Sequence, residues 1–355
     1  MLFSYTYTNH SMEKMQEYID YIFRNVWSIA KGKGYEVDVL FSGNIELKEI
    51  ITELHTSEVD GANFFLTGLE LVFEDFKKLS SVELALINHW YESNNNIELA
   101  CAGDPNVTPA TYSTVTQLSA ELSKNLKDFF KNLYSQSFLS LKSIKDRIGI
   151  IEGHYHDFME VNNEGKCPFC GINDVKGLDH SKREAYDHYL PKDKYPFNSI
   201  NFYNLVPTCH ECNSSYKLTK NPLFTNTGQR RKAFYPFSNN SPSIEIEVIL
   251  NITDWSTMSK NDIHLNTGPD HKREEIATWV DVYGIEERYK AKCCGENDGK
   301  GWIREIVDES ANYGLTPQQY LNGKLKTSEN DPWVDDNFLR KPFLDACKKA
   351  GLFNL

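Results

Sequence analysis

The residues of this chain whose types and spacing suggest chemistry lie in one central segment. Two Cys-x-x-Cys pairs, Cys167 with Cys170 and Cys209 with Cys212, stand 38 residues apart. A gap of two residues lets both sulfurs of a pair reach one ion, and four thiolates complete a tetrahedral zinc sphere. The two pairs therefore predict a shared structural zinc ion with no position left for a water; a redox pair is the alternative.

Polar residues of another kind lie between and beside these cysteines. Asp187 and His188 open the stretch DHYLPK, Asn204 lies in NLVPTC, and Asn213 directly follows Cys212. Neighbouring residues of a strand point to opposite faces. A strand at Asp187 can therefore offer the imidazole to a substrate, while the carboxylate approaches a metal from a twisted or bulged backbone. An Asp-His pair alone means little, and its weight comes from these positions.

Three motifs in this order, YDHYLPK, YNLVPTC and CNSSYK, carry a resemblance to a known family. Residues 166–219 resemble the HNH endonucleases. The core of that family, called ββα-metal, consists of a Cys knuckle, a strand with Asp-His, a loop Asn, a second Cys knuckle and a helix that begins with the last functional residue. The resemblance implies metal-dependent hydrolysis of DNA phosphodiester bonds.

The resemblance also implies a role for each matching residue. His188 would be the general base that deprotonates the attacking water, and Asn204 would fix the loop and the orientation of the His188 ring. Asp187 and Asn213 would hold one divalent cation, magnesium or alternatively manganese, and Lys217 would contact the substrate phosphate. Asn213 replaces the third histidine of the family, and an oxygen ligand favours a hard cation.

The same residue types suit the chemistry without the resemblance. Phosphodiester cleavage needs an aligned nucleophile, together with positive charge where the phosphoryl oxygens become more negative; a cation and a neutral imidazole supply both. Two alternatives remain at this point. A zinc-ribbon-like module that binds nucleic acid or protein without cutting has no use for Asp187, His188 and Asn213 together, and a nuclease acting on RNA would share the same chemistry.

Other histidines in and near this segment fit the site less well. A second Asp-His pair, Asp179 with His180, precedes SKRE rather than LPK and lies too far from Asn204 for the family spacing. We expect His210, inside the second knuckle, to face solvent or to contact the residues that bind the metal. We expect structural roles for His154 and His156.

The 355 residues divide by pattern into three regions of an α+β protein. Residues 1–150 are expected to be a helical domain, because apolar residues recur at helical spacing. Residues 151–240 are expected to be a nuclease domain that a structural zinc ion stabilises. Residues 241–355 are expected to be a mixed accessory region with a strand at 244–250 and a tail punctuated by proline and glycine. The helices are expected at 12–31, 47–54, 69–90, 115–134, 272–289 and 300–311.

The charge is distributed unevenly along the chain. The whole protein has a net charge of −12, yet residues 166–235 hold 11 lysines and arginines against 6 acidic residues, which leaves −17 for the rest. Clustered positive charge attracts a polyanion. The basic segment favours a focused DNA site, and its candidate contacts are Arg183, Lys192, Lys194, Lys220, Arg230, Arg231 and Lys232. The acidic flanks favour a protein partner, such as an ATPase or a sensor.

The resemblance extends to context. Larger bacterial HNH proteins often belong to mobile elements or anti-phage defence, and ATWVDVYGIEERY resembles the helix that follows their nuclease core, although it also fits a helix that only braces the core.

The chain lacks a signal-peptide pattern and an apolar run of about 18 residues. We therefore expect a cytoplasmic protein with no membrane contact, and ordinary thiols at Cys101, Cys293, Cys294 and Cys347.

Overall fold

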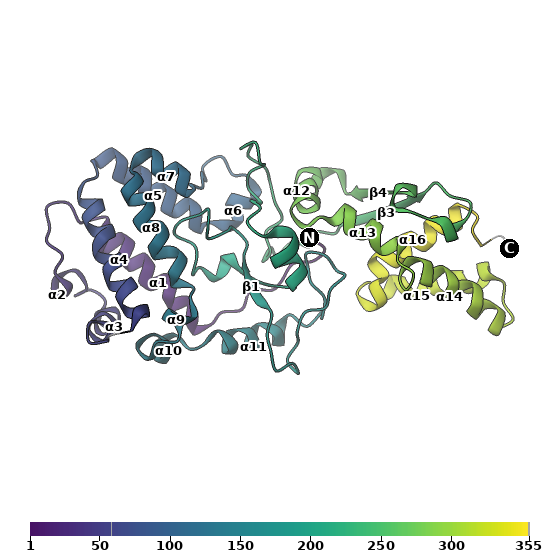
Figure 1. The fold of residues 1–355 in the computed structure, drawn as a ribbon, viewed down its shortest axis with the longest axis horizontal. Helices are drawn as coiled ribbons and strands as arrows, with labels where there is room; N and C mark the ends of the chain where they lie inside the picture. Colours follow the sequence, from purple (N-terminus) through teal and green to yellow (C-terminus); the bar gives the residue numbers. More distant parts are fainter. Residues whose placement is uncertain (58, 354–355) are drawn as a thin grey trace.

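The protein is elongated in the computed structural model, which describes residues 1–57 and 59–353. Helices occupy one end of the molecule, a small antiparallel strand pair lies near its middle, and a second strand pair with further helices forms the other end (Figure 1). This arrangement of helices with small antiparallel sheets confirms the α+β class. Among the described residues, no helix has both the length and the apolar character that crossing a bilayer requires.

The first part of the chain is helical, as predicted. A 3-10 turn (Ser11–Glu13) leads into α1 (Lys14–Tyr21), which continues as a π-helical stretch (Ile22–Trp27). The following helices are α2 (Val37–Leu40), α3 (Ile45–His55), α4 (Asp60–Lys77), α5 (Ser81–Asn95), α6 (Ile97–Ala102), α7 (Tyr112–Leu118), α8 (Ala120–Leu133), α9 (Gln136–Leu139), α10 (Lys142–Ile148) and α11 (Ile151–Val161).

Aromatic side chains fill the core between these helices. Trp27 is fully buried and packs against Phe76, Phe129 and Phe130, with ring centroids 5.9, 5.3 and 6.3 Å away. Its indole nitrogen donates to the Leu69 carbonyl at 3.0 Å, which satisfies the one polar atom of the ring. The apolar stripe predicted at 115–134 thus faces the core.

Two of the predicted helices are each divided in two by a serine cap. Residues 69–90 do not form one helix, because Ser80 Oγ accepts from the Glu83 amide and the Glu83 carboxylate accepts from the Ser80 amide. This reciprocal capping box starts α5. The expected helix at 115–134 likewise breaks where Ser119 caps α8 by accepting from the Leu122 amide.

The central segment contains two strands followed by a short helix. Strands β1 (Ala185–His188) and β2 (Leu205–Thr208) pair antiparallel, with His188 opposite Leu205. A π-helical segment (Glu211–Lys217) begins within the second Cys knuckle and includes Cys212. The order strand, strand, helix is the order that the resemblance implies.

The last part of the chain has a second strand pair and five α-helices among its described residues. Its elements are β3 (Glu245–Leu250), β4 (Ile263–Gly268), α12 (Arg273–Tyr283), α13 (Ile285–Cys294), α14 (Gly299–Asn312), α15 (Pro317–Asn330) and α16 (Asn337–Lys349). The predicted strand at 244–250 is confirmed, whereas the predicted helix at 272–289 is interrupted at Gly284. The tail, which prolines and glycines punctuate as noted from the sequence, contains two further helices, α15 and α16.

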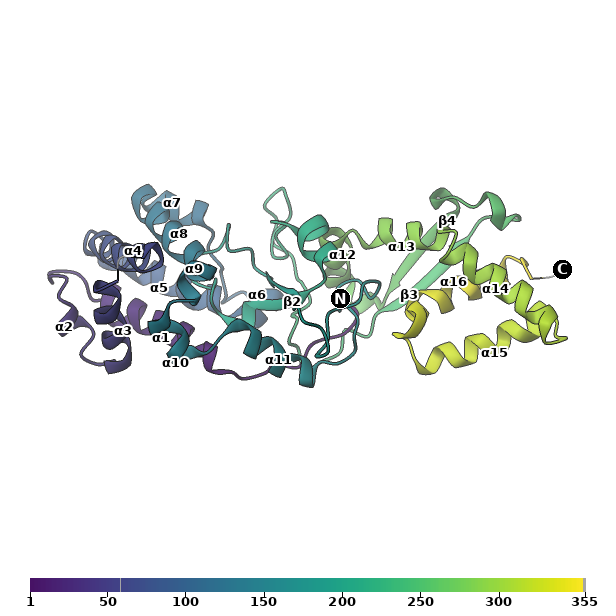
Figure 2. The same cartoon turned by 60° about the horizontal axis from the view of Figure 1, so that its bottom comes forward.

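The N-terminal segment before α1 does not stay with the helices. The Leu2 amide donates to the Pro168 carbonyl at 2.8 Å, and the Tyr5 amide donates to the Pro236 carbonyl at 2.8 Å. Figure 2 shows this segment running from α1 to the middle of the molecule. Residues 1–150 and 151–240 therefore share a packed boundary.

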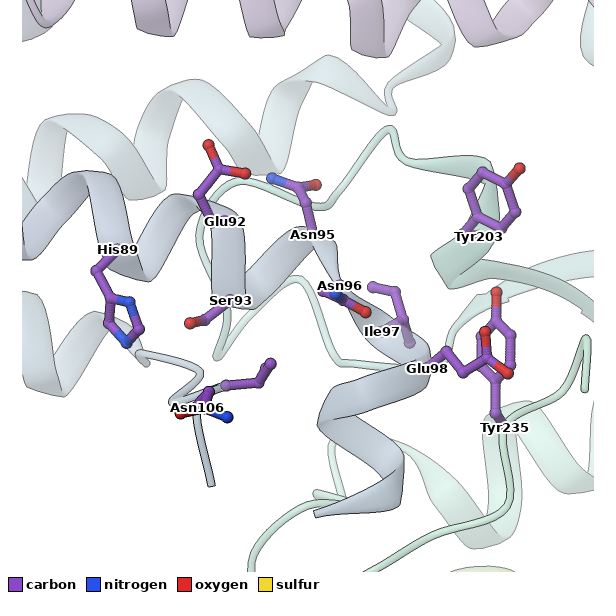
Figure 3. Close-up of a pocket in the computed structure, with 11 residues that line it drawn as sticks. His89, Glu92, Ser93, Asn95, Asn96, Ile97, Glu98, Asn106, Tyr203 and Tyr235 are labelled. Atoms are coloured by element: carbon purple, nitrogen blue, oxygen red, sulfur yellow. The ribbon is translucent and has the colours of Figure 1, made fainter. Parts of the chain in front are cut away.

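One cavity lies along this boundary. It has a volume of about 470 Å³ and is lined by the junction of α5 and α6, together with Tyr203 and Tyr235 (Figure 3). Its lining is mostly polar, with Glu92, Asn95 and Asn96 on the helical side. Tyr203 stacks on Tyr7 from the N-terminal segment, with ring centroids 4.0 Å apart.

Replacing Gly284 by alanine should destabilise the protein through two effects. Gly284 has a φ of +60°, and a Cβ there would overlap the ring of Tyr216. Gly314→Ala is the matched control, because Gly314 has a φ of +63° and no atom of the described residues lies within 4 Å of its Cβ position. We expect Gly314→Ala to lower the free energy of unfolding by about 1 kcal/mol through its φ alone. Gly284→Ala should lower it by about 1 kcal/mol or more beyond that, because of the overlap with Tyr216. Urea denaturation measures both; equal losses would contradict the packing effect.

Candidate metal centre and nuclease site

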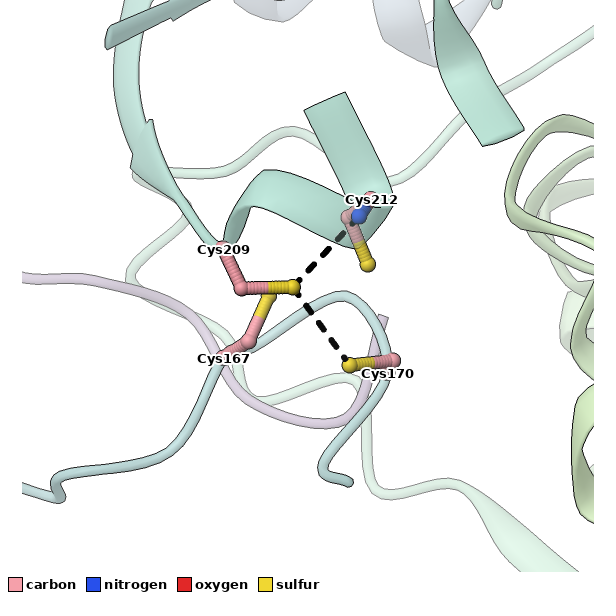
Figure 4. Close-up of side chains that lie close together, drawn as sticks. All are labelled: Cys167, Cys170, Cys209 and Cys212. Carbon is pink, nitrogen blue, oxygen red and sulfur yellow. Dashed lines mark hydrogen bonds between the residues drawn. The ribbon is translucent and has the colours of Figure 1, made fainter. Parts of the chain in front are cut away.

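The four cysteines of the two knuckles meet at one point. Their Sγ atoms all lie within 4.8 Å of one another, and Cys170 Sγ is 3.9 Å from Cys209 Sγ (Figure 4). A tetrahedral zinc with bonds of about 2.3 Å places its sulfurs about 3.8 Å apart. All four are buried, so the set fits a closed structural zinc site. The remaining cysteines lie outside this group and are buried or half-buried: Cys101, Cys293, Cys294 and Cys347.

Backbone hydrogen bonds hold each knuckle in shape. The Gly171 amide donates to the Cys167 carbonyl at 2.7 Å, and the Cys167 amide donates to the Asn173 carbonyl at 2.9 Å. In the second knuckle, the Cys212 amide donates to Cys209 Sγ at 3.4 Å. An amide directed at a sulfur favours the thiolate, which is the form that binds zinc.

Arg288 of α13 is a neighbour of the metal centre that the sequence did not reveal. Its guanidinium donates to Cys212 Sγ at 3.2 Å and to Asn173 Oδ1 at 2.9 Å, and it stacks over the Tyr216 ring at 4.6 Å. Burial opposes the charge on Arg288, but the thiolates of Cys212 and Cys170 outweigh burial and raise its pKa. Hydrogen bonds from the other three cysteines lower the pKa of Cys170, and Arg288 adds to this effect.

The sequence ATWVDVYGIEERY braces the first knuckle. Trp279 Nε1 donates to the Phe169 carbonyl at 2.6 Å, and Tyr289 Oη donates to the Cys170 carbonyl at 2.9 Å. The Tyr283 ring stacks on Phe169 at 4.6 Å. Helices α12 and α13 therefore hold the zinc site from the C-terminal side, which agrees with the reading of this sequence as a brace.

His188 ends β1 with its ring half-buried. Its Nε2 lies 2.9 Å from the carbonyl oxygen of Ser199, and the Tyr134 ring packs edge-on against it at 4.9 Å. A carbonyl only accepts, so Nε2 carries the hydrogen and the lone pair of a neutral ring lies on Nδ1. Burial, with the nearby Lys192 ammonium, lowers the pKa of His188 to about 3. The imidazole is therefore neutral at physiological pH.

Asp187, on the opposite face of β1, forms a buried ion pair with Lys217. Lys217 Nζ donates to Asp187 Oδ1 at 2.9 Å and to the His188 carbonyl at 2.8 Å, and both side chains are almost completely buried. Asp187 Oδ2 has no hydrogen-bond partner among the described residues. Burial raises the pKa of Asp187, while Lys217 opposes that shift. A phosphate contact by Lys217 would require Nζ to leave this pair.

The two asparagines occupy different positions. Asn204 is fully buried: its Oδ1 accepts from the Leu190 amide at 2.7 Å, and its Nδ2 donates to the Leu190 carbonyl at 3.0 Å and the Asn198 carbonyl at 3.2 Å. Asn213 is partly exposed near the start of the π-helical segment, and its side chain takes part in none of the hydrogen bonds found between described residues. The structure thus places Asn204 against the backbone just after His188 and pairs Lys217 with Asp187.

The competing histidines lie elsewhere. Asp179 and His180 are exposed on a turn, outside β1, and His210 is exposed as expected. His154 is buried, and its Nδ1 lies 2.5 Å from Tyr186 Oη. Burial lowers the pKa of His154 to about 4, so it is a neutral core residue, whereas His156 is exposed.

Part of the basic segment is used inside the protein. Arg231 pairs with Asp281 at 2.6 Å and donates to the Asn221 carbonyl, and Lys220 donates to the Asp281 carbonyl at 3.0 Å. These contacts join the central segment to α12. Lys192 differs from them, because it is half-buried above the Tyr134 ring beside His188. Its Nζ donates to the Lys131 carbonyl at 3.3 Å, and its side chain remains partly open to solvent.

Two known proteins are similar to short parts of this chain. Protein ea31 of Escherichia phage lambda is 41% identical over 63 residues, which are 18% of this chain and 19% of that protein. The Septu protein PtuB of Bacillus thuringiensis is 33% identical over 72 residues, 19% of this chain and 26% of that protein. The chain thus covers about a fifth of the length of protein ea31 and about a quarter of the length of PtuB. No family profile and no solved structure matches.

Removing the Arg288 guanidinium should weaken zinc retention without removing a ligand. A supporting contact to a metal ligand is worth about 10- to 100-fold in metal affinity, so we expect Arg288→Met to lose zinc to a chelator correspondingly more readily. Arg304→Met is the control, because Arg304 is 41% exposed and, among the described residues, pairs with Glu296 alone. A colorimetric chelator measures the release; equal release from both variants would contradict a role for Arg288 at the metal.

Proposed function

We propose that this protein is an HNH-type metal-dependent endonuclease that hydrolyses DNA phosphodiester bonds. The observation that carries the proposal is the orientation of His188, whose Nε2 is held by the Ser199 carbonyl while Nδ1 remains available as a base. His188 stands one residue from a buried carboxylate, on a strand pair that is closed by a zinc-type cysteine cluster. A zinc-ribbon-like binding module would need the cysteines but not this imidazole.

His188 is the group that takes a proton from the attacking water. A general base must be neutral and within hydrogen-bond reach of the water, and burial keeps this ring neutral. An approaching phosphate brings negative charge, which raises the pKa of a nearby imidazole and strengthens it as a base. Asn204 supports the ring indirectly, since it bonds to the Leu190 backbone on one side and to the Asn198 carbonyl on the other.

Asp187 and Asn213 are the residues that would hold a divalent cation, magnesium or alternatively manganese. The free Oδ2 of Asp187 is the feature that fits an ion, because a buried carboxylate oxygen without a partner is costly. When bound, the cation supplies positive charge for the phosphoryl oxygens and the leaving group. We assign to Lys217 the task of holding the other oxygen of Asp187.

The substrate class is DNA, with RNA as the other outcome of a cleavage assay. Lys192 lies beside His188 and is partly exposed, so we assign to it the phosphate contact that the sequence had suggested for Lys217. The similarity to a Septu protein and to a phage protein supports a place in anti-phage defence or in a mobile element. The acidic flanks support a protein partner, such as an ATPase or a sensor, in the cytoplasm.

His188→Ala should abolish cleavage of plasmid DNA while zinc content and folding stay unchanged. Losing a positioned base costs about two to four orders of magnitude in rate, and His188 binds no thiolate. Rates are measured with magnesium and with chelator on plasmid DNA and on structured RNA. Wild-type activity in this variant would reject His188 as the base, and DNA binding without cutting by the unmodified protein would favour the binding module.

Asn213→Ala should raise the magnesium concentration needed for half-maximal cleavage and leave zinc content unchanged. Zinc takes thiolates, whereas a hard cation takes oxygen ligands, so the two losses separate although Asn213 adjoins Cys212. Ser214→Ala is the matched control, an exposed neighbour on the same helical segment. An unchanged magnesium requirement in Asn213→Ala would remove Asn213 from the cation site.

A further inference from the structure

The loop that connects β1 to β2 is inserted into the helical region. Residues 195–201 are all buried, although loops normally run over the surface. This loop contains Ser199, whose carbonyl accepts the hydrogen bond from His188 Nε2. Whatever fixes the loop therefore also fixes the imidazole.

Phe197 anchors the loop in the aromatic core of the helical region. Its ring is fully buried and lies 5.6 Å from Phe23, 5.2 Å from Tyr91 and 5.4 Å from Phe130, measured between centroids. Its φ is +79°, in a backbone region that residues other than glycine rarely adopt. Surrounding packing must stabilise such a conformation, so the anchor depends on residues 1–150.

The end of α5 binds the same loop through its backbone. The last carbonyls of a helix have no partner within the helix. Here Asn198 Nδ2 donates to the Asn94 carbonyl at 3.0 Å, and Asn201 Nδ2 donates to the Asn95 carbonyl at 3.5 Å and to Asn95 Oδ1 at 3.0 Å. Two loop side chains therefore complete the C-terminal end of α5.

The side chain of Asn94 closes this joint from the helical side. Asn94 is fully buried, and its Nδ2 donates to the Pro196 carbonyl and to the Ala110 carbonyl, each at 2.9 Å. Its Oδ1 accepts from the Ala110 amide at 2.8 Å. On the other side of the loop, Ser199 Oγ donates to the Phe130 carbonyl of α8 at 2.6 Å. The loop is thus held between α5 and α8.

We propose that Asn94 is a positioning residue of the nuclease site: it fixes the loop whose Ser199 carbonyl orients His188. The helical region is then part of the cleavage machinery, in addition to any partner that it binds. This inference rests on the proposed function for its kinetic consequence, but the orientation of His188 can be measured without any cleavage.

The first test reads the His188 ring directly. Nitrogen-15 NMR of the histidine side chains distinguishes the two neutral tautomers. We expect the full-length protein to show His188 with its hydrogen on Nε2, and Asn94→Ala to show a mixture. Asn162→Ala is the matched control, because Asn162 is 3% exposed and likewise makes three side-chain hydrogen bonds. Its partners are Thr6 and Phe158, and neither belongs to this loop. An unchanged His188 signal in Asn94→Ala overturns the proposal.

The second test measures cleavage. A small displacement of a reacting group costs about 100-fold, so we expect Asn94→Ala to lower kcat on DNA by about 10- to 100-fold, and Asn162→Ala to change it by less than about 3-fold. Because Asn94 acts through His188, adding Asn94→Ala to His188→Ala should cause no further loss. A further loss of the same size in the double variant would show a general structural effect and overturn the proposal.

Two further outcomes remain informative. If Asn94→Ala does not fold, Asn94→Asp provides the same measurements, because it keeps the side-chain volume and the acceptor for the Ala110 amide but loses the donor to the Pro196 carbonyl. If the unmodified protein cuts neither DNA nor RNA, the proposed function fails, while the comparison of His188 tautomers still decides whether Asn94 positions the ring.

Discussion

The four-thiolate cluster is the interaction on which the central segment depends. Strands β1 and β2 have four residues each, too few to form a stable sheet alone. The cluster joins the residues before β1 to those after β2, so closing it brings the strands together, with His188 opposite Leu205. Binding of zinc at such a site is itself folding free energy. Arg288 adds α13 to the same cluster.

The charge of the basic segment has a different use from the one its composition suggests. An excess of positive charge predicts a surface for a polyanion, yet Arg231 and Lys220 bind groups of α12, and Lys217 neutralises Asp187. The buried pair of Lys217 and Asp187 contributes little to stability, but losing one partner would leave a costly unpaired charge. Lys192 keeps partial exposure beside His188, so position rather than net charge determines which basic side chain near this ring remains open to solvent.

Local patterns in the sequence predicted what local physics determines. The cysteine spacing, the strand at 244–250 and most helices follow from ligand geometry and periodicity, and the helix break at Ser80 was readable from the capping box with Glu83. The tail helix α15 also starts with a cap, at Thr316, that the prediction overlooked. Arg288 and Asn94 had no such signal. Each acts through residues about 76 or 102 positions away, and only the tertiary fold brings those together.

The buried loop between β1 and β2 limits how freely this site can be exchanged between proteins. Phe197 and Ser199 are complementary to one particular set of helices, since their partners Phe130, Tyr91 and Phe23 come from α8, α5 and the π-helical stretch. A recombination event that moved the strand pair alone would separate the loop from the helices that it packs against. Inheritance of the two regions as one unit is therefore the simplest evolutionary course, and substitutions around Phe197 should accumulate in compensating pairs across the boundary.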